Sequence, residues 1–150
     1  MTRRWILMMV LVSVPASWAK QLPLQYAVKF ICGRSNGTVV APGVYFTAIN
    51  VHNPSDKEVK FLKKVAVALP DEKAGPVTPL TSFVLGPDGA VEIDCKEIFA
   101  IAKQERFLKG FVVLESEQEL DVVGVYTAAG ATRQIETMEI ERVPVRKVSP

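Results

Sequence analysis

The chain has few of the side chains on which most hydrolases and metal sites depend. Its 150 residues include one histidine, His52, and two cysteines, Cys32 and Cys95. It contains no G-x-S-x-G nucleophile elbow, no G-x-x-x-x-G-K-S/T phosphate loop and no G-x-G-x-x-G dinucleotide fingerprint. The cysteines do not form a C-x-x-C motif, and two sulfurs with one imidazole make a poor zinc set. These absences disfavour nucleophilic and nucleotide-dependent enzymes, so we expect a protein without catalytic activity, bound metal or cofactor.

Long apolar runs are also missing, except near the start of the chain. A short basic head is followed by an apolar run over 5–14 and by the small residues Ser17 and Ala19 at the positions that a signal peptidase reads. A membrane-spanning helix needs roughly 20 apolar residues, which this interrupted run does not reach. The pattern predicts a secretory signal peptide over 1–19, with a retained anchor as the alternative. The mature chain would then begin at Lys20 and be periplasmic or secreted.

Excess charge of one sign disappears once this segment is removed. Arg3 and Arg4 account for two of the 18 basic side chains, so 18 − 2 = 16 remain against 16 acidic ones. A neutral chain has no electrostatic basis for attracting nucleic acid. The remaining cluster of lysines is interrupted by acidic residues and is interpreted as a solvated strand face; it comprises Lys57, Lys60, Lys63 and Lys64.

The two cysteines form an even pair in a chain that is expected to be exported. Oxidising compartments favour a disulfide between such residues. Closing the loop between Cys32 and Cys95 would stabilise the fold by roughly 4 kcal/mol. Two buried free thiols and a metal site completed by carboxylates are the alternatives.

The dominant periodicity is two, which is typical of half-buried strands. About eight short strands are predicted, over 25–32, 44–51, 58–69, 81–85, 90–94, 107–115, 120–128 and 134–143. This number and spacing predict an all-β, two-sheet immunoglobulin-like sandwich as one domain over 20–143. An up-and-down barrel is the alternative, and 144–150 should be a flexible tail.

Several segments have more specific predictions. The proline-rich stretch 70–79 should be a loop, and 81–94 should be a hairpin closed by a four-residue turn. A bulge is expected near Lys63 and Lys64. Residues 95–103 lose the alternation and predict a short helical crossover capped by Asp94. The most apolar strands, 107–115 and 120–128, should be central, and 134–143 should be an edge strand.

Two groups of acidic residues are candidates for acid–base catalysis or cation binding. Glu92, Asp94 and Glu97 could pair as acid and base, and Glu92 or Asp94 could act with His52 in a small hydrolase. A solvated hairpin edge and a helix cap also explain them. The second group could attract a cation but lacks a calcium-loop motif, so a solvated turn also explains it; its members are Glu115, Glu117, Glu119 and Asp121.

The apolar strand pair within 107–127, GFVVLES and LDVVGVYT, resembles the final strands of the sensory rhodopsin transducer family. The segment Asn50-Val51-His52-Asn53-Pro54 is similar to the end of that family's second strand. The resemblance covers about a third of the chain. It implies a β-sandwich that assembles as a homo-oligomer and binds partners. The predicted signal peptide and the two cysteines depart from that family, which is cytosolic.

Taken together, these features indicate an exported, non-catalytic β-sandwich that binds a protein partner or itself. A structural or assembly subunit of a cell-surface appendage is the main alternative. A small hydrolase that uses His52 with Glu92 or Asp94 is the other.

Overall fold

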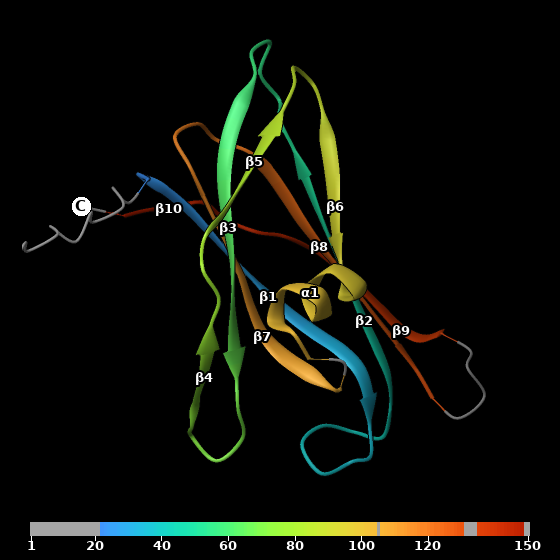
Figure 1. The fold of residues 1–150 in the computed structure, drawn as a ribbon. Coiled ribbons are helices and arrows are strands. Elements are labelled where there is room, and N and C mark those ends of the chain that lie inside the picture. Colours follow the sequence, from blue (N-terminus) through green and yellow to red (C-terminus); the bar gives the residue numbers. More distant parts are fainter. Residues whose placement is uncertain (1–21, 105, 131–134, 149–150) are drawn as a thin grey trace, which may run out of the picture.

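The computed structural model of the protein describes residues 22–104, 106–130 and 135–148. The predicted signal peptide over 1–19 therefore lies outside the described residues. The described chain is all-β with one helix, as predicted (Figure 1). Its elements are β1 (Leu24–Ser35), β2 (Gly43–His52), β3 (Val59–Ala68), β4 (Ala74–Val77), β5 (Thr81–Leu85), β6 (Ala90–Asp94), α1 (Cys95–Ala102), β7 (Leu108–Ser116), β8 (Asp121–Ala129), β9 (Ile135–Arg142) and β10 (Arg146–Lys147).

All ten strands belong to one antiparallel sheet, whose main order is β4-β3-β7-β1-β2-β8-β9. The strand β1 divides it into two parts. The β7 half contains β7, β3, β4 and β5, together with β10, which pairs with the start of β1. The β8 half contains β2, β6, β8 and β9. The two halves meet where 33–35 at the end of β1 pair with 43–45 of β2.

One hydrophobic core collects alternate residues from both halves and from the helix. In β1 the predicted apolar face is confirmed, because Tyr26, Val28, Phe30 and Cys32 are all buried. The predicted alternation of β3 holds from Val59 to Val67. Period-two patterning therefore identifies which side of these strands packs inward.

The connection between β5 and β6 differs from the predicted hairpin. β5 pairs with β3 in the β7 half, whereas β6 pairs with β2 in the β8 half. The turn over 86–89 thus carries the chain from one half to the other. A turn motif specifies a reversal of direction, but it does not specify which strands pair on either side of it.

Two further strands lie in segments that were predicted to be irregular. Within the proline-rich loop, β4 pairs with the end of β3. The tail predicted to be flexible from 144 instead forms β10, and the Val148 N–H donates to the Pro23 carbonyl at 2.9 Å. Both strands lie at edges, where short segments with little apolar periodicity can pair. The described sheet therefore contains ten strands, where about eight were predicted.

The helix α1 confirms the predicted crossover between the two halves. Asp94 accepts a hydrogen bond from the Glu97 backbone N–H at 3.0 Å, so the predicted cap is also confirmed. The carboxylate of Glu97 binds the Lys63 ammonium on β3 at 2.9 Å. Lys63 is 1% exposed and lies over the Phe83 ring, which corrects its interpretation as part of a solvated face. The register of β3 with β7 is continuous from Phe61 to Val67, so the bulge expected near Lys63 and Lys64 is absent from that ladder.

Candidate functional site: the outer face of the β8 half

The β8 half presents one side to the core and the other to the surroundings. The register places alternate residues of its four strands together on the outward side. We call this surface the outer face; it comprises Glu92 and Asp94 from β6, Phe46, Ala48 and Asn50 from β2, Val123, Val125 and Thr127 from β8, and Met138, Ile140 and Arg142 from β9.

The outer face carries exposed apolar side chains on its inner strand β2 and on its edge strand β9. Met138 and Ile140 are each 64% exposed, and Phe46 is 42% exposed. Cross-strand register makes them neighbours, since Thr127 lies between Phe46 and Met138 in one row. Contiguous exposed apolar surface of this kind is typical of a protein interaction site.

Charged groups lie at the two margins of the outer face and carry opposite signs. Glu92 and Asp94 lie on β6 at one margin, whereas Arg142 lies on β9 at the other. The Arg142 guanidinium donates to Asp121 at 2.7 Å, which holds the guanidinium near the start of β8. Protein interfaces commonly combine exposed apolar side chains with charged groups at their margins.

The opposite side of β9 carries carboxylates. Tyr126 lies beside them and donates its hydroxyl to Glu141 at 3.0 Å. Burial raises the pKa of the Tyr126 hydroxyl, and the hydrogen bond to Glu141 raises it further. Glu139 and Glu141 both belong to the edge strand, which pairs only with β8 in the described ladder. Charged side chains on an edge strand discourage edge-to-edge pairing of two sheets, so the edge of β9 is protected against such pairing.

The only histidine is held between two aspartates. His52 forms hydrogen bonds with Asp88 at 2.9 Å and with Asp121 at 3.3 Å. The bond to Asp88 is the main cause of the raised pKa of His52, followed by the bond to Asp121. Both ring nitrogens are therefore engaged with groups other than Glu92 and Asp94.

The predicted acid–base group is not assembled as a catalytic set. Asp94 is occupied as the cap of α1, and Glu97 is occupied by Lys63. Glu92 lies opposite Asn50 on the neighbouring strand. Within the described ranges, no three His, Cys, Asp or Glu side chains gather into a group that could hold a metal ion.

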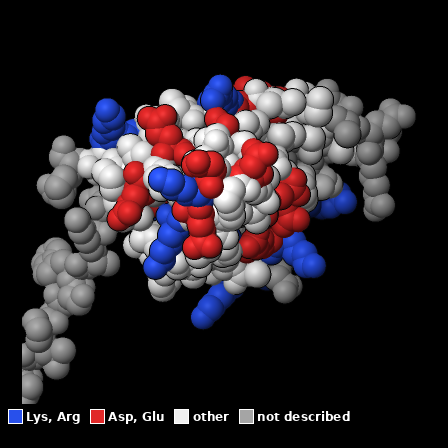
Figure 2. Space-filling model, turned by 90° about the horizontal axis from the view of Figure 1, so that it is seen from above, with Lys and Arg blue, Asp and Glu red and all other residues white. Residues whose placement is uncertain are grey.

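The second acidic group is dispersed by ion pairs. Glu115 is 2% exposed and accepts a hydrogen bond from the Lys64 ammonium at 2.7 Å. Asp121 is shared by His52 and Arg142. Glu117 and Glu119 remain exposed on the turn between β7 and β8. Figure 2 shows acidic side chains gathered at this end of the molecule, which also carries the β2–β3 and β5–β6 connections.

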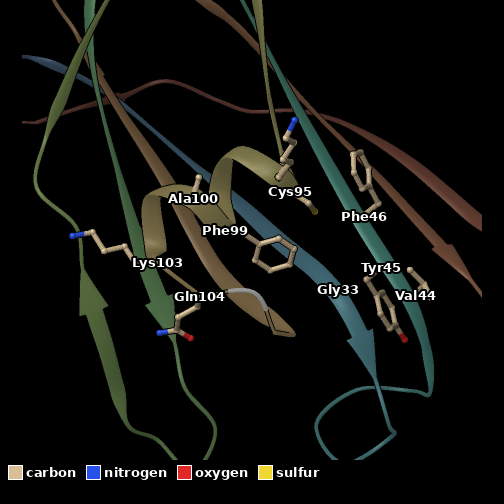
Figure 3. A pocket seen from close by; sticks show the side chains of 10 residues that line it. Gly33, Val44, Tyr45, Phe46, Cys95, Phe99, Ala100, Lys103 and Gln104 are labelled. Atoms are coloured by element: carbon tan, nitrogen blue, oxygen red, sulfur yellow. The ribbon is translucent and has the colours of Figure 1, made fainter.

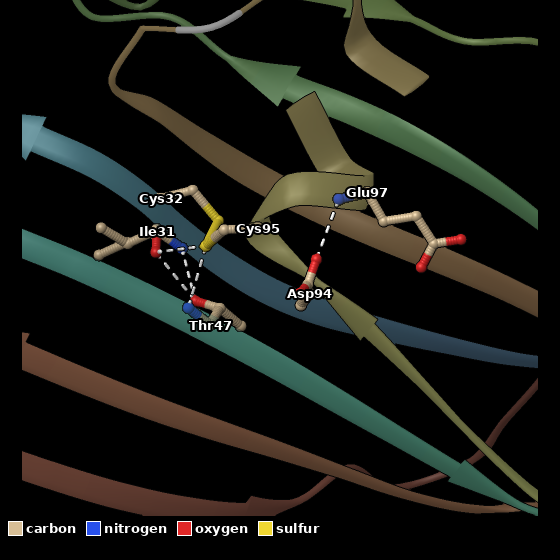
Figure 4. Close-up of a disulfide and its surroundings, with 6 residues drawn as sticks. All are labelled: Ile31, Cys32, Thr47, Asp94, Cys95 and Glu97. Atoms are coloured by element: carbon tan, nitrogen blue, oxygen red, sulfur yellow. Dashed lines mark hydrogen bonds between the residues drawn. A yellow bond between two sulfur atoms is a disulfide. The ribbon is translucent and has the colours of Figure 1, made fainter. Parts of the chain in front are cut away.

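The predicted pairing of Cys32 with Cys95 is confirmed. The two residues form a disulfide, with Cα atoms 5.5 Å apart, that ties the start of α1 to β1 (Figure 4). The described residues contain no free cysteine.

Sequence reasoning did not identify the outer face itself. The segment 134–143 was correctly placed as an edge strand, but its exposed apolar side depends on which strands lie beside it. The alternation of Met138 and Ile140 with Glu139 and Glu141 was the one available signal.

Comparisons with known proteins bear on the fold. No family model and no curated protein sequence matches the chain. The structure is similar to the crystal structure of Thermotoga maritima 1070, with a TM-score of 0.56 and 11% sequence identity. The similarity covers 87% of this chain and 100% of that chain. It extends through most of the β architecture and shows a shared fold. No helix in the described ranges has the length and apolar character needed to cross a membrane.

Proposed function

We propose that this protein is an exported, non-catalytic module that binds protein through its outer face, and that the partner on this face is a second copy of the chain. The exposure of the apolar side chains Phe46, Met138 and Ile140 on one face is the observation that carries the proposal. Burying such surface against a partner stabilises association by roughly 25 cal/mol per Å² before the entropic cost of association is subtracted. We further propose a two-sheet, immunoglobulin-like sandwich for its architecture, in which the two halves pack over the shared core.

A second copy fits the arrangement of charge on the face. Glu92, Asn50, Val123 and Arg142 lie in one row across four strands. A two-fold axis in the plane of the interface, roughly parallel to the strands, reverses this row in the facing copy. Arg142 of each copy then lies opposite Glu92 of the other, and Phe46 of each copy lies opposite Thr127 of the other. A two-fold contact is self-complementary in this way because each pairing occurs twice.

Export is supported by two features. The disulfide belongs to an oxidising compartment, and the sequence of 1–19 has the pattern of a signal peptide. The compartment would be the periplasm or the extracellular space. Self-association also agrees with the resemblance to the sensory rhodopsin transducer family.

Native mass spectrometry of protein purified from its own envelope fraction tests the proposal, because one spectrum gives both the stoichiometry and the processed mass. We expect a dimer whose chains begin at Lys20. The double variant Met138→Glu, Ile140→Glu should be monomeric, because it places charge on the most exposed apolar side chains of the interface. Val84→Glu is the matched control, since Val84 is 55% exposed on β5 in the other half.

A charge exchange tests the two-fold geometry directly. Glu92→Lys should weaken the dimer, and adding Arg142→Glu should restore it, because the opposing charges are then exchanged. Wild-type protein that stays monomeric at tens of micromolar would refute self-association. A dimer weakened as strongly by Val84→Glu as by the β9 variant would place the contact elsewhere.

A further inference from the structure

A break in strand pairing lies beside α1. On one edge of β2, β6 pairs with 48–52 and β1 pairs with 43–45. The described strands therefore leave Phe46 and Thr47 unpaired on this edge. The Thr47 N–H donates instead to the Sγ atom of Cys95 at 3.1 Å, and its hydroxyl bonds the backbone of Ile31 (Figure 4). The Cys95 sulfur of the disulfide thus accepts the hydrogen bond that a neighbouring strand would otherwise accept.

A cleft of about 930 Å³ opens at this break, between α1 and the first part of β2. Figure 3 shows the Phe99 ring pointing from the helix toward β1 and β2, with Tyr45 on the facing strand. Val44, Phe46 and Ala100 add further apolar surface. This volume is within the range of small-molecule sites, which are mostly apolar with a few polar groups.

The walls of the cleft are held in place. α1 is tied to β1 by the disulfide and to β3 by the pair of Glu97 with Lys63. The Tyr45 ring packs edge-on against Phe107, with centroids 6.1 Å apart. Gly33 lies in the lining, and a Cβ atom there would be 3.4 Å from the Phe99 ring. A preorganised site loses less entropy when a ligand binds.

The charged side chains that line the cleft are both cations. Among the described residues they are Lys96 and Lys103, which are both exposed and lie near opposite ends of α1. In Figure 3, Lys103 leaves the far end of the helix toward β4, so its flexible stem must turn to meet a ligand. Long lysine stems can cover apolar surface while keeping the ammonium in water. Their charge therefore favours an anionic group at the mouth of the cleft.

We propose that this cleft binds a flat aromatic carboxylate, with the ring between Phe99 and Tyr45 and the carboxylate at the lysine-bearing rim. Aromatic walls favour an aromatic ring through offset or edge-to-face packing. The site is separate in function from the outer face, although Phe46 borders both, so the test leaves Phe46 unchanged.

Isothermal titration calorimetry with three naphthalene probes of matched shape tests the proposal: naphthoate, naphthalenemethanol and naphthylmethylamine. Naphthoate should bind most tightly, roughly threefold to tenfold better than the neutral alcohol, because exposed ion pairs contribute little each. The amine should bind most weakly. Lys96→Met with Lys103→Met should remove the preference for naphthoate and leave binding of the alcohol unchanged. Lys57→Met, at the acidic end of the molecule, is the matched control and should change neither.

Ala100→Trp tests the location, since Ala100 is exposed on α1 and a large ring there fills the cleft. Naphthoate binding should be lost while the melting temperature stays within a few degrees of wild type. Equal affinity for the three probes would overturn the proposal that the cleft prefers an anionic ligand. Undiminished binding in Ala100→Trp, or no naphthoate binding to wild type at millimolar concentration, would overturn the site.

Discussion

Replacing the disulfide gives the sharpest test of how this fold is stabilised. Cys32 and Cys95 are separated by 63 positions, and both sulfurs lie in the core. Loop-closure entropy for a loop of this length is worth roughly 4 kcal/mol. A domain of this kind has a total stability of about 5–15 kcal/mol. The double variant Cys32→Ala, Cys95→Ala should therefore lose a large share of its free energy of unfolding.

A second contribution comes from Thr47. Its N–H donates to the Cys95 sulfur, and the residue is fully buried. Removing the sulfur leaves that donor without a partner, at a cost of about 1–3 kcal/mol. The variant Cys32→Ala, Cys95→Ser keeps an acceptor at this position. It should be more stable than the double alanine variant by about 1 kcal/mol.

Urea unfolding followed by far-ultraviolet circular dichroism measures both effects. The slope of the unfolding free energy against urea should also rise, because an uncrosslinked denatured chain exposes more surface. Wild type treated with a reducing agent strong enough to open the bond should behave like the variants. A double alanine variant within about 1 kcal/mol of wild type would refute the loop-closure reasoning.

Three further predictions concern other parts of the chain. Gly110→Ala should lower the free energy of unfolding by about 2–3 kcal/mol or more, because the added methyl overlaps the Ala66 carbonyl oxygen. Gly86→Ala is the control, since a Cβ atom there meets nothing within 4 Å, and it should be nearly neutral in the same urea assay. The pKa of His52 is raised in the folded protein, so the stabilisation that its two aspartates provide is present below the unfolded pKa and is lost as the pH rises through the folded pKa. An NMR titration of the imidazole should show a lower pKa in Asp88→Asn than in wild type. An unchanged pKa would contradict the assigned cause. Both tryptophans lie in 1–19, so purified processed protein should show tyrosine but no tryptophan fluorescence, and tryptophan emission would show that the segment is retained.

The strands and the crossover were predictable because they depend on local chemistry. Alternation from Tyr26 to Cys32 identifies a buried face without knowledge of its partners. Asp94 precedes the point at which alternation stops, which is the usual position of a helix cap.

Long-range pairing was the part that local patterns could not supply. The carboxylate that binds Lys63 belongs to Glu97, 34 positions along the chain, so a run of lysines was interpreted as solvated. His52 lies 36 positions from Asp88 and 69 from Asp121, so its two partners were not identified. The outer face is defined by the strand order, which a turn motif does not determine.

The arrangement of the two ends and the disulfide gives the domain a defined response to mechanical tension. Pro23 and Val148 are joined by a hydrogen bond, so pulling them apart loads the β1–β10 ladder one bond at a time. Force that peels β1 away reaches Cys32 and then passes through the covalent bond to Cys95. The segment between the cysteines, which carries β2 to β6, is bypassed and bears no load. A stretched molecule would thus extend at both ends while the length of chain between its cysteines remained locked.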